Sequence, residues 1–205
     1  MNKRNATKSV AVYAGLTAAI GLLGLSLSGC SETKREFVSV DLTGAQYARE
    51  LALPDTEGKV RSIKDFAGKV VVVFFGFAQC PDVCPTTLAE VAEAKKLLGP
   101  QGDKLQAIFV TVDPERDTPE VLKAYMANFD PSFVALRGTP EQTAAAAKEF
   151  KIFYKKVGGS TATSYTVEHS TGSYVFDATG RVRLYTRYQL GAQALADDVR
   201  LLLKS

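Results

Sequence analysis

The chain has 205 residues, enough for one domain of ordinary size plus an N-terminal extension. Its content of 46% hydrophobic and 23% charged residues is typical of a globular protein and argues against a disordered one. The net charge of +3 stems from Lys3, Arg4 and Lys8, because the rest of the chain has 22 basic and 22 acidic residues. A neutral domain has little electrostatic attraction to nucleic acid, so we expect no nucleic-acid partner.

The N-terminal residues have the pattern of a secretory signal, in which cations precede an uncharged apolar run. The run ends in LSGC at residues 27–30, which resembles the lipobox of bacterial lipoproteins, where the cysteine is acylated. We therefore expect a signal peptide at residues 1–29, an acylated Cys30 with a polar tether at 30–36, and one domain at 37–205. An uncleaved transmembrane anchor is the alternative. Either would hold the domain on the extracytoplasmic (periplasmic) face of a bacterial membrane.

A continuous run of valine and phenylalanine at 70–77 is the clearest structural signal in the chain. It predicts a strand buried on both faces, in the middle of a sheet that is covered on both sides. Cys80 and Cys84 follow at its carboxyl end, and Pro85 opens a helical pattern that runs over 86–98. The two cysteines therefore lie at a junction between a strand and a helix.

The later elements alternate in the order of an α/β fold. They are a strand at 107–112, a helix at 118–129, a short strand at 133–136, a helix at 139–151, a small-residue loop at 158–163, two hairpin strands at 173–176 and 182–186, and a closing helix at 192–203. The apolar face of the second helix is expected to include Val121, and Thr139 and Gln142 can form a capping box. This order predicts a thioredoxin-like fold with a mixed central sheet flanked by helices.

The cysteine pair lies where ligands bind in an open α/β sheet, beyond the carboxyl end of a strand. A helix N-terminus favours thiolate over thiol, and thiolates bind copper(I), zinc or iron–sulfur centres. Iron–sulfur clusters need four cysteines, and structural zinc needs four Cys or His ligands. The chain has one histidine, His169, so Cys80, Cys84 and His169 give at most three such ligands in one site. Copper, as Cu(I) or Cu(II), accepts that number.

His169 lies shortly before the hairpin strand at 173–176. In a thioredoxin-like fold this junction approaches the cysteine loop, and thioredoxins place a cis-proline there. All eight prolines of the chain fall between Pro54 and Pro140, so that proline is absent. An imidazole at this position would point toward the two sulfurs.

Three segments resemble the SCO/SenC family of copper-binding assembly factors: FFGFAQCPDVCP at 74–85, VTVDPERDTPEVLKAY at 110–125 and SYTVEHSTGSYVFDATG at 164–180. The resemblance implies that Cys80, Cys84 and His169 bind copper. It also implies a role in assembling the dinuclear copper centre of cytochrome c oxidase, by copper transfer, by reduction of the target's cysteines, or by both. The implied partners are the copper-centre subunit of the oxidase and another copper chaperone or thiol reductant. One departure is Glu168, where members commonly have Asp.

Other functions fit part of the pattern. An extracytoplasmic thiol–disulfide oxidoreductase would use Cys80 and Cys84 as a redox pair, although such enzymes usually have two residues between the cysteines. A peroxiredoxin-like peroxidase would use Cys84, but a threonine would then be expected where Pro81 stands. A structural disulfide would leave His169 without a role.

Three further features have two interpretations each. The charged segment DPERD at 113–117 is expected to be a solvated turn and helix start, and the alternative is a docking surface. Asp82 either serves as a turn residue or orients a ligand. Tyr165 either lines the metal site or packs in the core.

Overall fold

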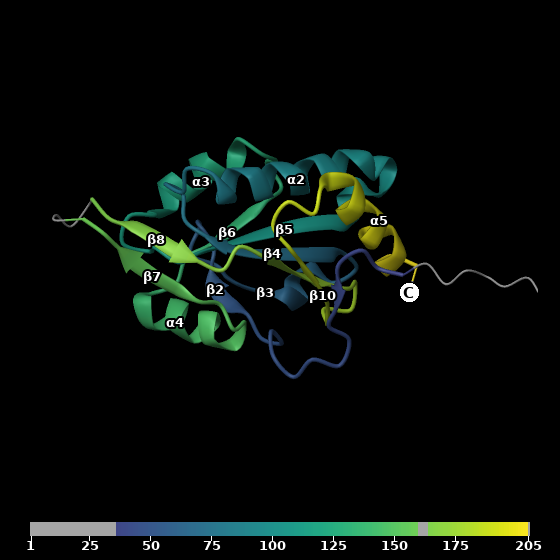
Figure 1. Cartoon of the computed structure of the whole chain (residues 1–205), viewed down its shortest axis with the longest axis horizontal. Helices are drawn as coiled ribbons and strands as arrows, with labels where there is room; N and C mark the ends of the chain where they lie inside the picture. Colours follow the sequence, from purple (N-terminus) through teal and green to yellow (C-terminus); the bar gives the residue numbers. More distant parts are fainter. Residues whose placement is uncertain (1–35, 160–163, 205) are drawn as a thin grey trace, which may run out of the picture. The chain divides into compact units, whose positions relative to one another are not determined.

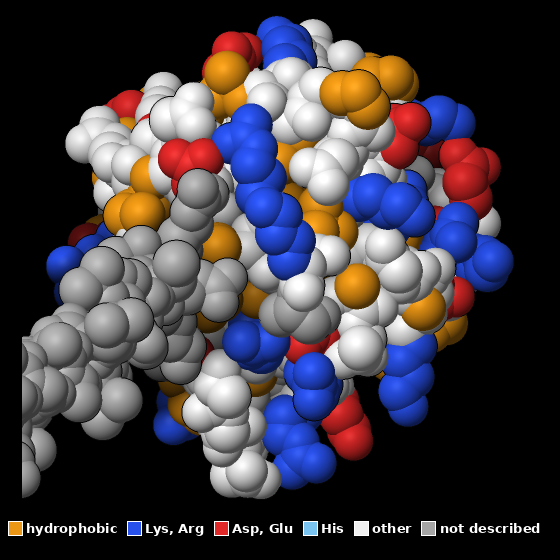
Figure 2. Space-filling view, turned by 90° about the vertical axis from the view of Figure 1, so that its right-hand side faces the viewer, with side chains coloured by type: hydrophobic (Ala, Val, Ile, Leu, Met, Phe, Trp, Pro, Cys, Tyr) orange, Lys and Arg blue, Asp and Glu red, His pale blue; other side chains and the backbone are white. Residues whose placement is uncertain are grey.

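The computed structural model describes residues 36–159 and 164–204. The predicted signal peptide, the predicted acylated Cys30 and part of the predicted loop at 158–163 lie outside these residues. Within the described ranges, no helix is both long enough and apolar enough to cross a membrane. The face that Figure 2 shows carries dispersed Lys and Arg side chains, among which hydrophobic side chains are scattered.

A six-stranded mixed sheet forms the centre of the described part (Figure 1). Its strands are, in spatial order, β1 (Val40–Asp41), β10 (Val182–Thr186), β9 (Ser173–Phe176), β4 (Val70–Gly76), β5 (Leu105–Thr111) and β6 (Val134–Leu136). The β4, β5 and β6 strands run parallel, whereas β9 is antiparallel to both of its neighbours. Two small antiparallel sheets lie outside it: β2 (Ala52–Pro54) with β3 (Val60–Ser62), and β7 (Tyr154–Val157) with β8 (Thr166–His169).

Helices cover both faces of the central sheet. They are α2 (Val83–Leu97), α3 (Pro119–Ala127), α4 (Pro140–Glu149) and α5 (Ala192–Leu202), with two short 3-10 helices, η1 (Ile63–Phe66) and η2 (Gly99–Lys104). Figure 1 shows α2, α3 and α5 on one face and α4 on the other, and the buried side chains divide into two cores in the same way. This is the thioredoxin-like α/β arrangement that the sequence predicts.

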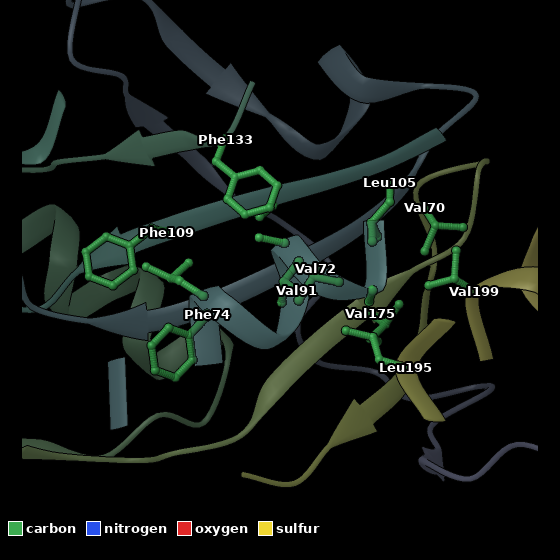
Figure 3. Close-up of a cluster of buried hydrophobic side chains, with 14 of the residues drawn as sticks. Val70, Val72, Phe74, Val91, Leu105, Phe109, Phe133, Val175, Leu195 and Val199 are labelled. Carbon is green, nitrogen blue, oxygen red and sulfur yellow. The ribbon is translucent and has the colours of Figure 1, made fainter. Parts of the chain in front are cut away.

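Strand β4 lies in the middle of the sheet, and all seven of its residues are buried. Because alternate side chains point to opposite faces, Val72 and Phe74 join the core under α2, while Val73 and Phe75 join the core on the side of α4. Figure 3 shows the first of these cores, with Val91 of α2 among its members. Burial of each side chain of this size contributes about 1.5–3 kcal/mol to the free energy of folding, so the strand holds the start of the following loop in a fixed position.

Most of the predicted elements are confirmed. The two hairpin strands have the predicted bounds, and the capping box of Thr139 with Gln142 is present. Helix α2 begins before Pro85 rather than after it. The N–H groups of a first helical turn have no partner within the helix, so a proline is tolerated there.

The sequence patterns predicted neither the short strands β1, β2 and β3 nor the hairpin of β7 and β8. Its strands, YKKV and TVEH, are short and mostly exposed, so neither forms the apolar run that would have indicated a strand. His169 is consequently the last residue of a strand of its own. The predicted apolar face of α3 is wrong at Val121, whose side chain is 40% exposed.

Candidate metal centre

Three side chains from separate parts of the chain meet beyond the carboxyl end of β4. Cys80 lies in the loop after β4, Cys84 in the first turn of α2, and His169 at the end of β8. The two Sγ atoms and a ring nitrogen of His169 all lie within 4.8 Å of one another. In the part of the chain that the structure describes, no other three His, Cys, Asp or Glu residues form such a group.

The spacing of these donor atoms suits a single metal ion. Thiolate and imidazole donors bind at about 2.0–2.3 Å, so two donors on one ion lie roughly 3.5–4 Å apart. Contraction of the group from 4.8 Å therefore requires movements of less than about 1 Å. Two sulfurs and one imidazole nitrogen form a donor set that suits copper.

The two thiols have opposite properties. Cys84 is fully buried, whereas Cys80 is only partly buried, and neither forms a disulfide. The hydrogen bond from the Cys84 thiol lowers the pKa of Cys80 to about 4, and contacts with His169 and with backbone N–H groups also lower it. Burial raises the pKa of the Cys84 thiol far above its usual range, and the adjacent Cys80 thiolate raises it further. The pair therefore shares one proton near neutral pH, with the thiolate on the more accessible sulfur.

The imidazole ring of His169 is oriented by a backbone contact. Its Nδ1 lies 2.8 Å from the carbonyl oxygen of Ser170, and because a carbonyl can only accept, Nδ1 carries the proton. The lone pair of Nε2 is then directed to the sulfurs, 3.5 Å from Cys84 Sγ. The rings of Phe74 and Phe77 meet the imidazole edge-on, with centroid distances of 5.9 and 5.8 Å. This is the tautomer and orientation that a metal-binding histidine requires.

Gly76 makes room for the buried sulfur. A Cβ atom on this residue would lie 2.6 Å from Cys84 Sγ and 2.9 Å from the ring of Phe109. Gly76 is the last residue of β4, where the chain turns toward the cysteine loop. A side chain at this position would therefore displace Cys84.

The charged segment at 113–117 is not the solvated turn that the sequence analysis expected. Asp113 and Asp117 are both fully buried. Asp113 accepts a hydrogen bond of 2.6 Å from the hydroxyl of Tyr165, and Asp117 accepts one of 2.6 Å from Thr111. Tyr165 therefore bonds to this segment rather than to the sulfurs. The one signal available in the sequence was the i, i+3 spacing of Asp113 and Arg116, which form an ion pair.

Two other charged residues near the donors remain at the surface. Asp82 is exposed and its carboxylate accepts hydrogen bonds from Thr86 and Tyr188, so this side chain acts at the start of α2, while its backbone N–H is one of those that lower the pKa of Cys80. Glu168 is exposed and pairs across the hairpin with Lys155. The departure from the common Asp at this position therefore leaves the donor group unchanged.

Comparison with known proteins gives a consistent result. The family model SCO1/SenC matches residues 40–204. A SCO2-like protein from Rickettsia felis is 31% identical over 175 residues, which are 84% of this chain and 85% of the relative. Protein SenC from Rhodobacter capsulatus is 35% identical over 176 residues, which are 84% of this chain and 76% of the relative.

Solved structures agree with these relatives. ScoI from Bradyrhizobium japonicum, solved with copper bound, is 38% identical with a TM-score of 0.66, and the match covers 74% of this chain and 96% of that one. Apo Sco1 from Thermus thermophilus is 35% identical with a TM-score of 0.72, covering 84% of this chain and 99% of that one. The family match, the relatives and the shared fold together show that the chain belongs to the SCO1/SenC family.

Proposed function

We propose that the protein is a copper metallochaperone that assists assembly of the dinuclear copper centre of cytochrome c oxidase. Its cargo is one copper ion, held by Cys80, Cys84 and His169. The observation that carries this proposal is the convergence of two sulfurs and one oriented imidazole within 4.8 Å. Three relatives solved with copper bound, from Bradyrhizobium japonicum, Arabidopsis thaliana and yeast, support the choice of metal.

The accessibility of the donors suits a protein that releases its ion. Cys80 is partly exposed and ionised, so a cysteine of the target can reach an ion bound there and replace the protein's ligands one at a time. Cu(I) would depend mainly on the two thiolates, because soft sulfur ligands select it, whereas Cu(II) would depend strongly on the imidazole of His169.

The same cysteine pair also suits reduction of a disulfide in the target. The Cys80 thiolate would attack one target sulfur and release the other as a thiolate. Cys84 would then give its proton to the released target thiolate and attack the Cys80 sulfur, which releases the second target thiolate and leaves a Cys80–Cys84 disulfide. Two electrons pass to the target. The observation that favours this second role is the contrast between an accessible thiolate and a buried thiol beside it.

The peroxidase alternative fits the geometry poorly. A peroxiredoxin-like mechanism needs Cys84 as an accessible thiolate, but this residue is fully buried and its pKa is raised by burial. Rapid peroxide consumption that is lost in Cys84→Ser would contradict the proposed function.

We further propose that the domain is lipid-anchored on the extracytoplasmic side of a bacterial membrane. In this proposal, residues 1–29 are a signal peptide, Cys30 is acylated and 37–205 form the copper-binding domain. A SCO1/SenC family lipoprotein from Bacillus anthracis, 25% identical over 77% of this chain with a TM-score of 0.64, supports the anchor. The contact of Phe37 with the core under α5 supports the domain start. Labelling with a radioactive fatty acid, lost in Cys30→Ala, tests the proposal.

Copper titration of the reduced, full-length protein tests the metal site. We expect about one equivalent to bind, and we expect His169→Ala to weaken Cu(II) more than about 100-fold while Cu(I) changes little, since its preferred ligands are thiolates. Glu168→Gln is the matched control, because this exposed neighbour donates no ligand. If His169→Ala alters neither affinity, the histidine is not a ligand.

Deleting the gene and measuring the copper content of cytochrome c oxidase tests the cellular role. The proposal predicts a copper-deficient oxidase that is restored by the wild-type gene and by the Glu168→Gln gene, but not by the His169→Ala gene. Normal oxidase copper in the deletion strain would contradict the proposed role.

A further inference from the structure

The hairpin that carries His169 does not belong to the central sheet. Strand β8 pairs with β7 in a separate two-stranded sheet, whereas the two cysteines follow β4 of the central sheet. Figure 1 shows this hairpin extending past the end of the central sheet. Backbone pairing between these sheets therefore does not fix the distance from the imidazole to the sulfurs. The short segment 170–172, which leads from His169 into β9, and contacts between side chains and loops set it together.

A closed ring of three residues attaches the hairpin to the loop between β5 and α3. Arg116 donates from Nη1 to the carbonyl oxygen of Tyr165 at 2.8 Å, and its guanidinium group lies 3.8 Å from the centre of the tyrosine ring. The Tyr165 hydroxyl donates to Asp113 at 2.6 Å. Arg116 Nε donates to the other oxygen of the same carboxylate, which closes the ring. The side chains of Arg116 and Asp113 are only 10% and 0% exposed.

The other end of the same loop contacts the segment that leads to the cysteines. The buried carboxylate of Asp117 accepts the backbone N–H of Ala78 at 3.0 Å, and Ala78 lies between β4 and Cys80. The loop of five residues, 113–117, therefore contacts both the hairpin that carries His169 and the segment that leads to the cysteines. We expect a change in its contact with the hairpin to move the imidazole while the sulfurs stay in place.

We propose that Asp113, Arg116 and Tyr165 form a clamp that positions His169 against the two sulfurs and so determines how strongly the site prefers Cu(II) over Cu(I). The inference rests on the proposed copper site. Because Cu(I) is held mainly by sulfur and Cu(II) needs the imidazole, a displaced hairpin weakens the second ion selectively. The clamp residues act through His169 and do not themselves bind the metal.

The variant Tyr165→Phe tests the clamp with the smallest change, because it keeps the ring under Arg116 and removes only the hydroxyl. Arg116→Lys is a second test, since it keeps the charge but loses the planar group that spans Asp113 and the tyrosine carbonyl. The matched control is Tyr154→Phe, on the neighbouring strand β7. Among the described residues, the Tyr154 hydroxyl has no hydrogen-bond partner.

Cu(I) and Cu(II) affinities are measured by chelator competition on the full-length variants, with electron paramagnetic resonance of the Cu(II) forms. We expect both clamp variants to lose about tenfold or more in Cu(II) affinity, as other changes next to a metal ligand do, with a spectrum shifted toward that of His169→Ala. Cu(I) affinity should stay within about twofold, because sulfur holds this ion. Tyr154→Phe should match the wild type in all three measurements.

Thermal unfolding of each variant separates positioning from stability. Equal losses of Cu(I) and Cu(II) affinity that follow the unfolding temperature would overturn the clamp. Wild-type Cu(II) affinity and spectrum in Tyr165→Phe and Arg116→Lys would also overturn it. If His169→Ala has a large effect in the same experiment, the proposed copper site still holds and only the clamp is rejected. If His169→Ala itself has no effect, the proposed site fails and the clamp fails with it.

Discussion

Replacing Gly76 with alanine adds one methyl group beside the buried sulfur and so gives a severe test of the geometry of the donor group. The added Cβ would lie 2.6 Å from Cys84 Sγ, 2.9 Å from Phe109 and 3.0 Å from Phe74. Non-bonded heavy atoms prefer about 3.5–4.0 Å, so all three groups must shift, and the sulfur, which is the nearest, must move by about 1 Å. Strand β4 resists this movement, because β5 pairs with it as far as Gly76 and β9 pairs with it as far as Phe74.

The sulfur is therefore the group that moves furthest. Overpacking of this kind costs about 1–3 kcal/mol of folding free energy. A shift of Cys84 Sγ by about 1 Å is comparable with the whole adjustment that metal binding requires, so we expect Cu(I) affinity to fall about tenfold or more. The variant should unfold at a lower temperature and bind copper more weakly.

Chelator competition and thermal unfolding measure the two effects separately. Gly138→Ala is the matched control, since its Cβ would lie 2.8 Å from Gln142 and 2.9 Å from Leu53 and so clashes comparably without touching a sulfur. It should destabilise the fold and leave copper affinity unchanged. Wild-type Cu(I) affinity in Gly76→Ala would refute the described position of Cys84.

Three other expectations come from the charges and thiols. Because its pKa is lowered to about 4, Cys80 should react with iodoacetamide at a nearly constant rate from about pH 8 down to pH 5 and slow only near pH 4; a tenfold loss per pH unit below pH 8 would contradict this. Oxidising Cys80 and Cys84 to a disulfide should abolish Cu(I) binding in chelator competition, because a disulfide provides no thiolate. Asp198→Ala should lower the free energy of urea unfolding by about 2–4 kcal/mol, because the backbone N–H groups of Val38 and of the buried Ser39 lose a fully buried, charged acceptor; a loss below about 0.5 kcal/mol would contradict it.

Local patterns in the sequence were sufficient for five of the six strands of the central sheet and for the cysteine pair, but not for the edge strand β1. The apolar run of β4 and the spacing of Cys80 and Cys84 are confined to neighbouring residues, and both specify a junction of strand and helix. The position of His169 depends on a fold in which residues 85 apart in the chain come into contact. It was predicted only by placing the residue on an expected thioredoxin-like fold.

The burial of charged residues was the feature that could not be predicted from the sequence. DPERD at 113–117 reads as a surface turn because its composition is charged, and only its partners show otherwise. Tyr165 lies 52 residues beyond Asp113, on a hairpin whose polar strands gave no periodic signal. The sequence of a charged segment alone thus does not indicate that a distant tyrosine and a neighbouring arginine form hydrogen bonds with its buried carboxylate.

X-ray absorption of the protein loaded with one equivalent of Cu(II) tests the central claim most directly. The account predicts two sulfur scatterers and one imidazole nitrogen at about 2.0–2.3 Å, and it predicts that the imidazole contribution disappears in His169→Ala. A copper shell without sulfur, or one that is identical in wild type and His169→Ala, would contradict it.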